Sequence, residues 1–151
     1  SAHSASIGGL RERHGLERHE IVTLASIVEA ETQVASERRL VARVILNRLE
    51  ESMRLQMDPT CVYGPEVYHR EPHPSLCKDP TNRYSTYVVD GLPPGPIGNP
   101  GRVSLEAAAN PAEGEEAEEY LYFVARRDGS GRHVFSRNYR EHRRAVERHL
   151  K

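Results

Sequence analysis

Apolar residues recur at helical spacing in two segments near the start of the chain. In the segment 20–31, one helical face is formed by Ile21, Leu24, Ala25 and Val28. The next segment follows Ser36, which can act as an N-cap, and its apolar stripe consists of Leu40, Val41, Val44, Ile45 and Leu49. The outer face of this second helix is predicted to carry Arg38, Arg39, Arg43 and Arg48. The pattern therefore predicts two consecutive helices.

No regular period persists from residue 52 to residue 101, where proline and glycine become frequent. The densest part is Gly91-Leu-Pro-Pro-Gly-Pro-Ile-Gly-Asn-Pro-Gly101. Its four prolines have fixed φ angles and no amide donors, which excludes a helix or a central strand. This segment is predicted to be a stiff, irregular loop.

The last third of the chain predicts a short helix, a β-hairpin and a final helix. Ser104 is expected to cap the short helix, which Pro111 ends. The runs 120–126 and 132–136 are rich in aromatic and β-branched residues, and a Gly-containing turn at 128–131 joins them. Asn138 can cap a final helix to Leu150. We expect the hairpin and final helix to act as scaffold, with core positions at Tyr120, Tyr122, Phe123 and Val124.

These elements define an α+β fold in a single domain: N-terminal helices, an irregular Pro/Gly-rich middle, a C-terminal hairpin and a final helix. The length of 151 residues suits one domain. We interpret residues 1–18 as a linker and 19–151 as the domain. With 37% hydrophobic residues and a net charge of −1, the chain does not match a disordered protein. No apolar run approaches the roughly 18 residues of a membrane span, and no signal peptide is recognisable.

The charge distribution is uneven but does not predict nucleic-acid binding. Five glutamates form an acidic patch within 113–119, and residues 126–151 carry nine Arg or Lys against three acids. Such runs are usually solvated faces. No Gly-rich phosphate loop, zinc-finger spacing or RNA-binding aromatic signature accompanies the basic stretch.

The two cysteines, Cys61 and Cys77, lie in a stretch rich in proline and histidine. Three states are open: a disulfide, two free thiols, or a metal site together with His69 and His73. The spacing fits none of the common zinc patterns, so no metal is predicted. In an oxidising compartment a disulfide closing this loop would contribute on the order of 3 kcal/mol.

Two carboxylates end the first predicted helix, and helical geometry separates them. Glu31 lies within about 50° of the centre of the apolar stripe, whereas Glu29 lies roughly 110° away on the flank. Burial disfavours a charged carboxylate and raises its pKa, which suits a general acid at neutral pH. In the structural alternative, Glu31 reaches the surface and pairs with an arginine of the next helix. Spacing alone leaves both roles open.

A series of sequence blocks follows in order along nearly the whole chain, from about Ile21 to Leu150. The blocks are Leu24-Ala-Ser-Ile-Val-Glu-Ala-Glu-Thr32, Val44-Ile-Leu-Asn-Arg-Leu49, Met53-Arg-Leu-Gln-Met-Asp-Pro-Thr60, Tyr63-Gly64, Tyr84-Ser-Thr-Tyr87, the loop 91–101, Ser104-Leu-Glu-Ala-Ala108, Tyr120-Leu-Tyr-Phe-Val-Ala125 and His133-Val-Phe-Ser136. Together they resemble one known family, the catalytic domain of the YceG-like endolytic murein transglycosylases. In that family the Glu immediately before Thr in the first block is the catalytic acid, which the resemblance assigns to Glu31.

The resemblance implies an enzyme that cleaves the β-1,4 bond between N-acetylmuramic acid and N-acetylglucosamine in peptidoglycan strands. Cleavage uses no water and leaves a 1,6-anhydro end, with Glu31 as acid and then base, and no cofactor. Asp58 is the one plausible candidate for the second carboxylate that a hydrolase would need, and a turn before Pro59 is its structural alternative. Ser85 stands where the family usually has Asn. Substrate-binding roles are expected for Gln56, Asp58, Tyr84, Ser85, Tyr87 and Asn99.

The resemblance also implies where the protein works and with what. The substrate places it in the cell envelope, on the outer face of the cytoplasmic membrane, with peptidoglycan strands and cell-wall synthases as partners. Membrane attachment would need an anchor that this chain does not contain. Two alternatives remain: a non-catalytic peptidoglycan-binding module, and a nucleic-acid or regulatory protein that binds through its basic C-terminal stretch.

Overall fold

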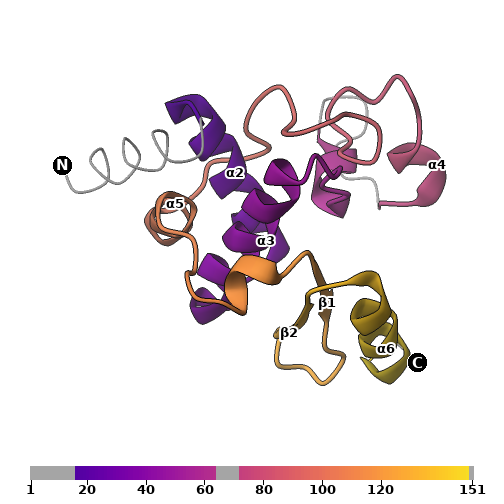
Figure 1. The fold of residues 1–151 in the computed structure, drawn as a ribbon. Coiled ribbons are helices and arrows are strands. Elements are labelled where there is room, and N and C mark those ends of the chain that lie inside the picture. Colours follow the sequence, from indigo (N-terminus) through magenta and orange to yellow (C-terminus); the bar gives the residue numbers. More distant parts are fainter. Residues whose placement is uncertain (1–15, 64–71, 150–151) are drawn as a thin grey trace.

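The computed structural model describes residues 16–63 and 72–149, and its helices and single hairpin form an α+β domain, as predicted (Figure 1). The longer elements are α2 (Arg18–Glu31), α3 (Arg38–Glu50), α5 (Arg102–Ala109), β1 (Tyr122–Ala125), β2 (His133–Ser136) and α6 (Tyr139–His149). Shorter turns of helix are η1 (Ala35–Glu37), η2 (Asp58–Val62), α4 (Pro74–Cys77) and η3 (Ala117–Glu119). No helix among these residues is both long and apolar enough to cross a bilayer.

The core lies between α2, α3 and α5, which pack against one another. Helix α2 is buried around most of its circumference from Ile21 to Val28, and the middle of α3 is equally enclosed. The residues that fill this core are almost all Leu, Ile, Val and Ala, as the composition requires. Burial of these side chains is the main stabilising contribution to the domain.

Three predicted helix caps have different outcomes. Ser36 lies in η1 rather than at a cap, so α3 begins at Arg38 after Glu37. Ser104 is buried inside α5, which starts at Arg102 with Gly101 as its N-cap. Both predictions are wrong. Helix α3 begins one residue later than a cap at Ser36 would give, and α5 begins three residues earlier than a cap at Ser104 would give. Asn138 does cap α6, since its Oδ1 accepts a 2.9 Å hydrogen bond from the amide of Glu141.

Two of the four arginines predicted on the outside of α3 are buried instead. Arg43 and Arg48 are only 6% and 7% exposed. Arg43 donates to the carbonyl of Ala112 at 2.6 Å, and Arg48 donates to those of Leu121 and Leu55 at 2.6 and 3.1 Å. Carbonyl groups of distant loops therefore replace water around these guanidinium groups, which periodicity alone does not reveal.

The irregular loop 91–101 lies along α2 and is fastened to it by two side chains. The hydroxyl of Ser26 accepts from the amide of Ile97 at 3.0 Å, and the carboxylate of Glu29 accepts from the amide of Gly101 at 2.7 Å. Leu92 and Ile97 pack against the core. The loop is irregular, as predicted, and it is held in place by these contacts.

The hairpin and α6 form the opposite side of the domain from the N-terminus of α2 (Figure 1). Strands β1 and β2 are antiparallel, with Phe123 opposite Phe135, and α6 packs on both strands. Two contacts between Glu37 and His133, both 2.9 Å long, fasten the hairpin to the start of α3. This arrangement brings the hairpin close to the helix that follows Glu31.

Candidate active site

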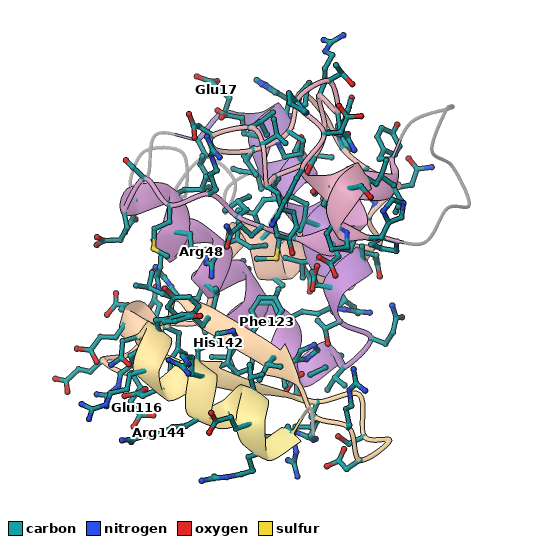
Figure 2. The ribbon with its side chains drawn as sticks, turned by 90° about the vertical axis from the view of Figure 1, so that its right-hand side faces the viewer. Glu17, Arg48, Glu116, Phe123, His142 and Arg144 are labelled. Atoms are coloured by element: carbon teal, nitrogen blue, oxygen red, sulfur yellow. A yellow bond between two sulfur atoms is a disulfide. The ribbon has the colours of Figure 1, made fainter. Side chains whose placement is uncertain are left out.

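A cleft of about 560 Å³ opens between the end of α2 and the hairpin with α6. Figure 2 shows Arg48, Phe123 and His142, three of its lining residues, between the helices and the hairpin. Elements far apart in the chain thus meet at one hollow. Its lining consists of Glu31, Arg48, Leu55, Gln56, Met57, Asp58, Pro59, Tyr87, Tyr122, Phe123, Val124, Tyr139, His142 and Val146.

Glu31 is the last residue of α2 and supplies a carboxyl group to this cleft. Burial, reinforced by the negative charge of Asp58, raises the Glu31 pKa from its ordinary 4.5 to about 7. Within the described part of the chain this carboxyl takes part in no hydrogen bond or ion pair that would hold it charged. A carboxylic acid that is half protonated at neutral pH can both give and take a proton, as a general acid-base group must.

Asp58 and Tyr87 form a hydrogen-bonded pair beside Glu31. The hydroxyl of Tyr87 donates to Oδ1 of Asp58 at 2.5 Å. Burial first, and then this bond to Asp58, raises the pKa of Tyr87, so its hydroxyl stays neutral and remains a donor. The negative charge of Asp58 also disfavours ionisation of Glu31. Asp58 therefore adds to the effect of burial on the candidate acid.

Two buried threonines hold the segments that carry Asp58 and Tyr87 together. Thr86 Oγ1 accepts from the amide of Met57 at 2.8 Å, and Thr60 Oγ1 accepts from the amide of Thr86 at 3.0 Å. Both threonines are fully buried. No local pattern indicates this role for them, although each lies within two residues of a predicted site residue.

Glu29 lies outside the cleft, in keeping with its predicted place on the flank of the helix. Its two oxygens bind the amide of Gly101 at 2.7 Å and the guanidinium group of Arg38 at 3.4 Å. Its side chain is 35% exposed. Glu29 thus connects α2 to the start of α5, and Glu31 is the acid of this helix that enters the cleft.

Of the other residues predicted to bind substrate, Gln56 lies in the cleft, whereas Tyr84 and Asn99 lie outside it. Gln56 lines the cleft, in a left-handed backbone conformation with φ of 53°. Tyr84 packs on Tyr63, with ring centroids 4.7 Å apart, and Asn99 is exposed in the loop 91–101. Among the described residues, the lining of the cleft does not include Tyr84 or Asn99.

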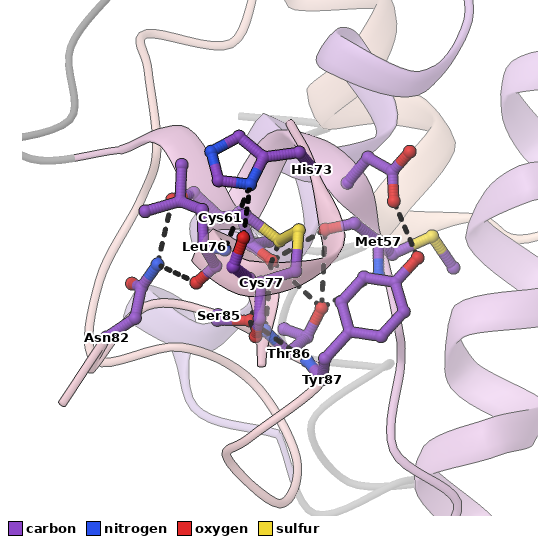
Figure 3. The surroundings of a disulfide bond; sticks show 12 residues. Met57, Cys61, His73, Leu76, Cys77, Asn82, Ser85, Thr86 and Tyr87 are labelled. Carbon is purple, nitrogen blue, oxygen red and sulfur yellow. Dashed lines mark hydrogen bonds between the residues drawn. A yellow bond between two sulfur atoms is a disulfide. The ribbon is translucent and has the colours of Figure 1, made fainter. Parts of the chain in front are cut away.

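Ser85 is fully buried, which does not fit the expected contact with a sugar. Its hydroxyl donates to the carbonyl of Cys77 at 2.5 Å (Figure 3). The same hydroxyl lies 3.6 Å from Sγ of Cys61, so the two disulfide-linked residues enclose it. A buried hydroxyl with a backbone partner serves the local fold.

The structure joins Cys61 and Cys77 in a disulfide (Figure 3). The bridge connects η2 to α4, and the side-chain amide of Asn82 bonds to the carbonyls of Cys61 and Leu76 on either side of it, at 2.9 and 3.2 Å. The ring of His73 accepts from the amide of Leu76 at 3.3 Å and so caps α4. His69, part of the metal alternative, lies outside the described residues. In residues 16–63 and 72–149, no three His, Cys, Asp or Glu side chains converge as metal ligands would.

The hairpin and α6 are more than scaffold, which corrects the prediction for this part of the chain. Tyr122, Phe123 and Val124 are half-buried and line the cleft. Of these three, Phe123 also packs against the core, as predicted. The guanidinium group of Arg48 lies 4.9 Å from the centroid of the Tyr122 ring, and His142 stacks on the same ring at 5.0 Å. The clustering of aromatic and histidine residues at 120–123 and 139–142 is the sequence signal that could have indicated this wall.

The surroundings of His142 in this wall favour its neutral form. Burial and the nearby positive charge of Arg48 lower its pKa. Its Nδ1 is buried and has no hydrogen-bond partner within the described part of the chain. The cleft therefore has an acidic side, with Glu31 and Asp58, and a mainly aromatic side.

Comparisons with known proteins agree on one family. A family model described as the YceG-like family matches residues 2–148. An endolytic murein transglycosylase from Bacillus subtilis is 38% identical over 133 residues, which cover 87% of this chain and 35% of that protein. A protein of the same name from Streptococcus pneumoniae is 32% identical, with 87% of this chain and 24% of that protein covered.

A solved structure shows the same fold. The crystal structure of a yceG-like protein from Listeria monocytogenes matches with a TM-score of 0.77 and 34% identity, covering 93% of this chain and 44% of that one. The present chain spans about a quarter to a third of the length of the curated relatives above.

Proposed function

The chain belongs to the YceG-like family, and on that premise we propose that it is a lytic transglycosylase acting on peptidoglycan. It cleaves the β-1,4 bond between N-acetylmuramic acid and N-acetylglucosamine within glycan strands and leaves a 1,6-anhydro end. The names of the relatives support the reaction class. The observation that carries the proposal for this chain is the Glu31 carboxyl, buried in a cleft and titrating at about pH 7.

Glu31 performs both proton transfers in this proposal. The protonated carboxyl gives its proton to the glycosidic oxygen as the bond from that oxygen to C1 of the muramic acid breaks. The resulting carboxylate then takes the proton of the C6 hydroxyl, whose oxygen forms the new bond to C1. Glu31 ends protonated again, so the cycle needs no water and no second proton carrier.

Asp58 has a supporting role in this scheme. Hydrolases of sugars generally use two carboxyl groups, but an internal nucleophile removes that need. Tyr87 binds the Asp58 carboxylate, whose negative charge adds to burial in raising the Glu31 pKa to about 7. The same negative charge favours the positive charge that develops at C1 in the transition state.

The rings of Tyr122, Phe123, Tyr139 and His142 form one side of the cleft, which we call the aromatic wall. This wall and Gln56 bind the sugars on either side of Glu31. Tyrosine rings offer apolar faces to sugar rings, and their hydroxyls offer hydrogen bonds. Gln56 supplies both a donor and an acceptor next to Asp58. This assignment includes Tyr122 and Tyr139 from the C-terminal part, together with Tyr87.

Mass spectrometry of digested peptidoglycan tests the reaction. We expect the protein to release fragments with 1,6-anhydro-muramic ends, and no new reducing ends. Release of reducing ends alone would show hydrolysis. Binding of strands without any product would favour the alternative of a non-catalytic peptidoglycan-binding module, and in that case loss of Glu31 would leave binding unchanged.

The place of action follows from the substrate. Peptidoglycan lies outside the cytoplasmic membrane, so we infer an envelope location, in which the disulfide can form. Cell-wall synthases are the protein partners that the family resemblance implies.

A further inference from the structure

Helix α6 presents two neighbouring faces, and only one of them belongs to the cleft. Tyr139, His142 and Val146 line the cleft. A second hollow of about 290 Å³, which we call the basic hollow, is lined by Tyr139, Arg140, Arg143, Arg144 and Glu147. At 100° per residue the arginine face is turned about 120° from the cleft face. Tyr139 lines both, so the two hollows are adjacent.

The three arginines of the basic hollow are exposed and unpaired. Within the described residues, none of Arg140, Arg143 and Arg144 makes a hydrogen bond or an ion pair. By contrast, Arg137 at the start of the same helix is paired with Glu119 and Glu141. Glu147 is the one acid that lines the hollow. Glu141 interacts with Arg144 through its charge, without a direct ion pair in the described part of the chain. The lining of the basic hollow therefore carries three positive charges against one negative charge.

Tyr139 is the most exposed large aromatic side chain of the described part of the chain, at 60%. Its ring centroid lies 6.0 Å from that of Tyr122 in the cleft wall. An exposed aromatic face at the junction of two hollows suits a sugar ring that continues out of the cleft. It extends the aromatic wall toward the arginines.

We propose that the basic hollow binds the carboxylates of the peptide stems carried by the glycan strand, while Tyr139 contacts the adjoining sugar. The inference rests on the proposed function, and it adds a specificity site to it. Muramic acid residues carry short peptides with free carboxylates, and guanidinium groups bind carboxylates in a bidentate geometry. A strand seated at Glu31 reaches the hollow over Tyr139 without leaving the surface.

Binding measurements on two kinds of strand test the proposal. We would use purified glycan strands with intact stems and strands whose stems an amidase has removed, with Glu31→Gln as the background to prevent cleavage. Adding Arg143→Gln and Arg144→Gln should weaken binding of stem-bearing strands about three- to tenfold, as expected for two exposed ion pairs. The loss should be smaller on stem-free strands and should shrink as salt is raised.

A charge-matched control is available at the far end of the molecule and at the hairpin turn. Arg18 and Arg127 are exposed and line neither the cleft nor the basic hollow. Arg18→Gln with Arg127→Gln removes the same charge and should leave the affinity for both strands unchanged. Tyr139→Ala should weaken the binding of both kinds of strand by the same factor, because it removes a contact with the sugar.

Equal affinity of the Arg143→Gln/Arg144→Gln variant and its background for stem-bearing strands would overturn the proposal. So would an equal loss on both strands. If the variant instead lost affinity for phosphatidylglycerol vesicles alone, the face would be a membrane contact and the proposal would be wrong. Failure of the proposed function would be seen separately. If the parent protein releases no anhydro ends but binds stem-bearing strands through these arginines, the proposed function is wrong and the stem-binding role of the basic hollow is supported.

Discussion

The hydroxyl of Tyr87 donates a 2.5 Å hydrogen bond to the carboxylate of Asp58, and both side chains line the cleft that contains Glu31. The bond satisfies Asp58 as a charged group, and that charge adds to burial in raising the Glu31 pKa to about 7. The neighbouring carboxyl of Glu31 is therefore half protonated at neutral pH. Different surroundings divide the roles between two chemically similar groups.

Replacing Glu31 by Gln should abolish the proposed activity. The amide cannot protonate the glycosidic oxygen or accept the C6 proton, and general acid-base catalysis is typically worth about 10²–10⁴-fold. We expect the loss of activity to lie at the upper end of this range or beyond it, because one residue serves both proton transfers. The measurement is release of anhydro fragments from peptidoglycan.

Glu29→Gln is the matched control, two residues away on the same helix. Its side chain can still accept from the amide of Gly101 and loses only the 3.4 Å ion pair with Arg38. We expect most activity to remain. Near-parental activity of Glu31→Gln together with loss in Glu29→Gln would contradict the assignment of the acid.

The rate should depend on pH through Glu31. The first step needs the protonated acid, so kcat/KM should fall as pH rises above about 7. Asp58→Asn removes the negative charge, so the Glu31 pKa should fall and the alkaline limb should move to lower pH. Burial, the larger cause, should still keep this pKa above 4.5. A limb that moves to higher pH in Asp58→Asn would contradict this account.

Stability should depend on pH through the same group. Because the Glu31 pKa is higher in the folded protein, folding takes up a proton between pH 4.5 and about 7, and the free energy of unfolding falls as pH rises through this window. Glu31→Gln removes that dependence. Its gain in stability over the parent should be near zero below pH 4.5 and approach on the order of 3 kcal/mol above pH 7, as an upper bound. Urea unfolding of both proteins at pH 4 and pH 8 measures the difference; an equal difference at both would refute it.

The disulfide should stabilise the domain. Cys61 and Cys77 are separated by 16 residues, and closing a loop of that length contributes about 3 kcal/mol. Replacing both by Ser should therefore lower the free energy of unfolding by about this amount. Thiol counting on the denatured, unreduced protein should detect no free thiol after folding under oxidising conditions. Two reactive thiols there would show that the bridge does not form.

Arg48→Met should destabilise the fold as well as the cleft. Arg48 is 7% exposed and donates to the carbonyls of Leu121, Arg54 and Leu55 at 2.6, 2.9 and 3.1 Å. Leaving these acceptors unpaired should cost about 2–4 kcal/mol. Arg39→Met, at an exposed position with one bond to Asn110, is the control and should cost less than about 1 kcal/mol. Equal unfolding midpoints for the two variants would contradict the structural role of Arg48.

Features that depend on local geometry could be predicted from the sequence. The spacing of Ile21, Leu24 and Val28 indicates a helical face, and the same 100° rotation places Glu31 at its edge and Glu29 on its flank. The prolines of 91–101 exclude regular structure because they lack amide donors. Asn138 caps α6 as predicted, through the amide three residues on. These properties are encoded within one or two turns of the chain. The predicted caps at Ser36 and Ser104 do not form.

Features that depend on what covers a residue were decided by the tertiary structure alone. Arg48 looks like a surface residue by periodicity, but carbonyls from Leu55 and Leu121 enclose it. Ser85 looks available to a sugar, but the carbonyl of Cys77 binds its hydroxyl in the interior. Tyr122 looks like core, but packing of α6 and α3 leaves it as a wall of the cleft. In each case the partner lies outside the local helix or strand, so its burial depends on packing between elements, which no local pattern contains.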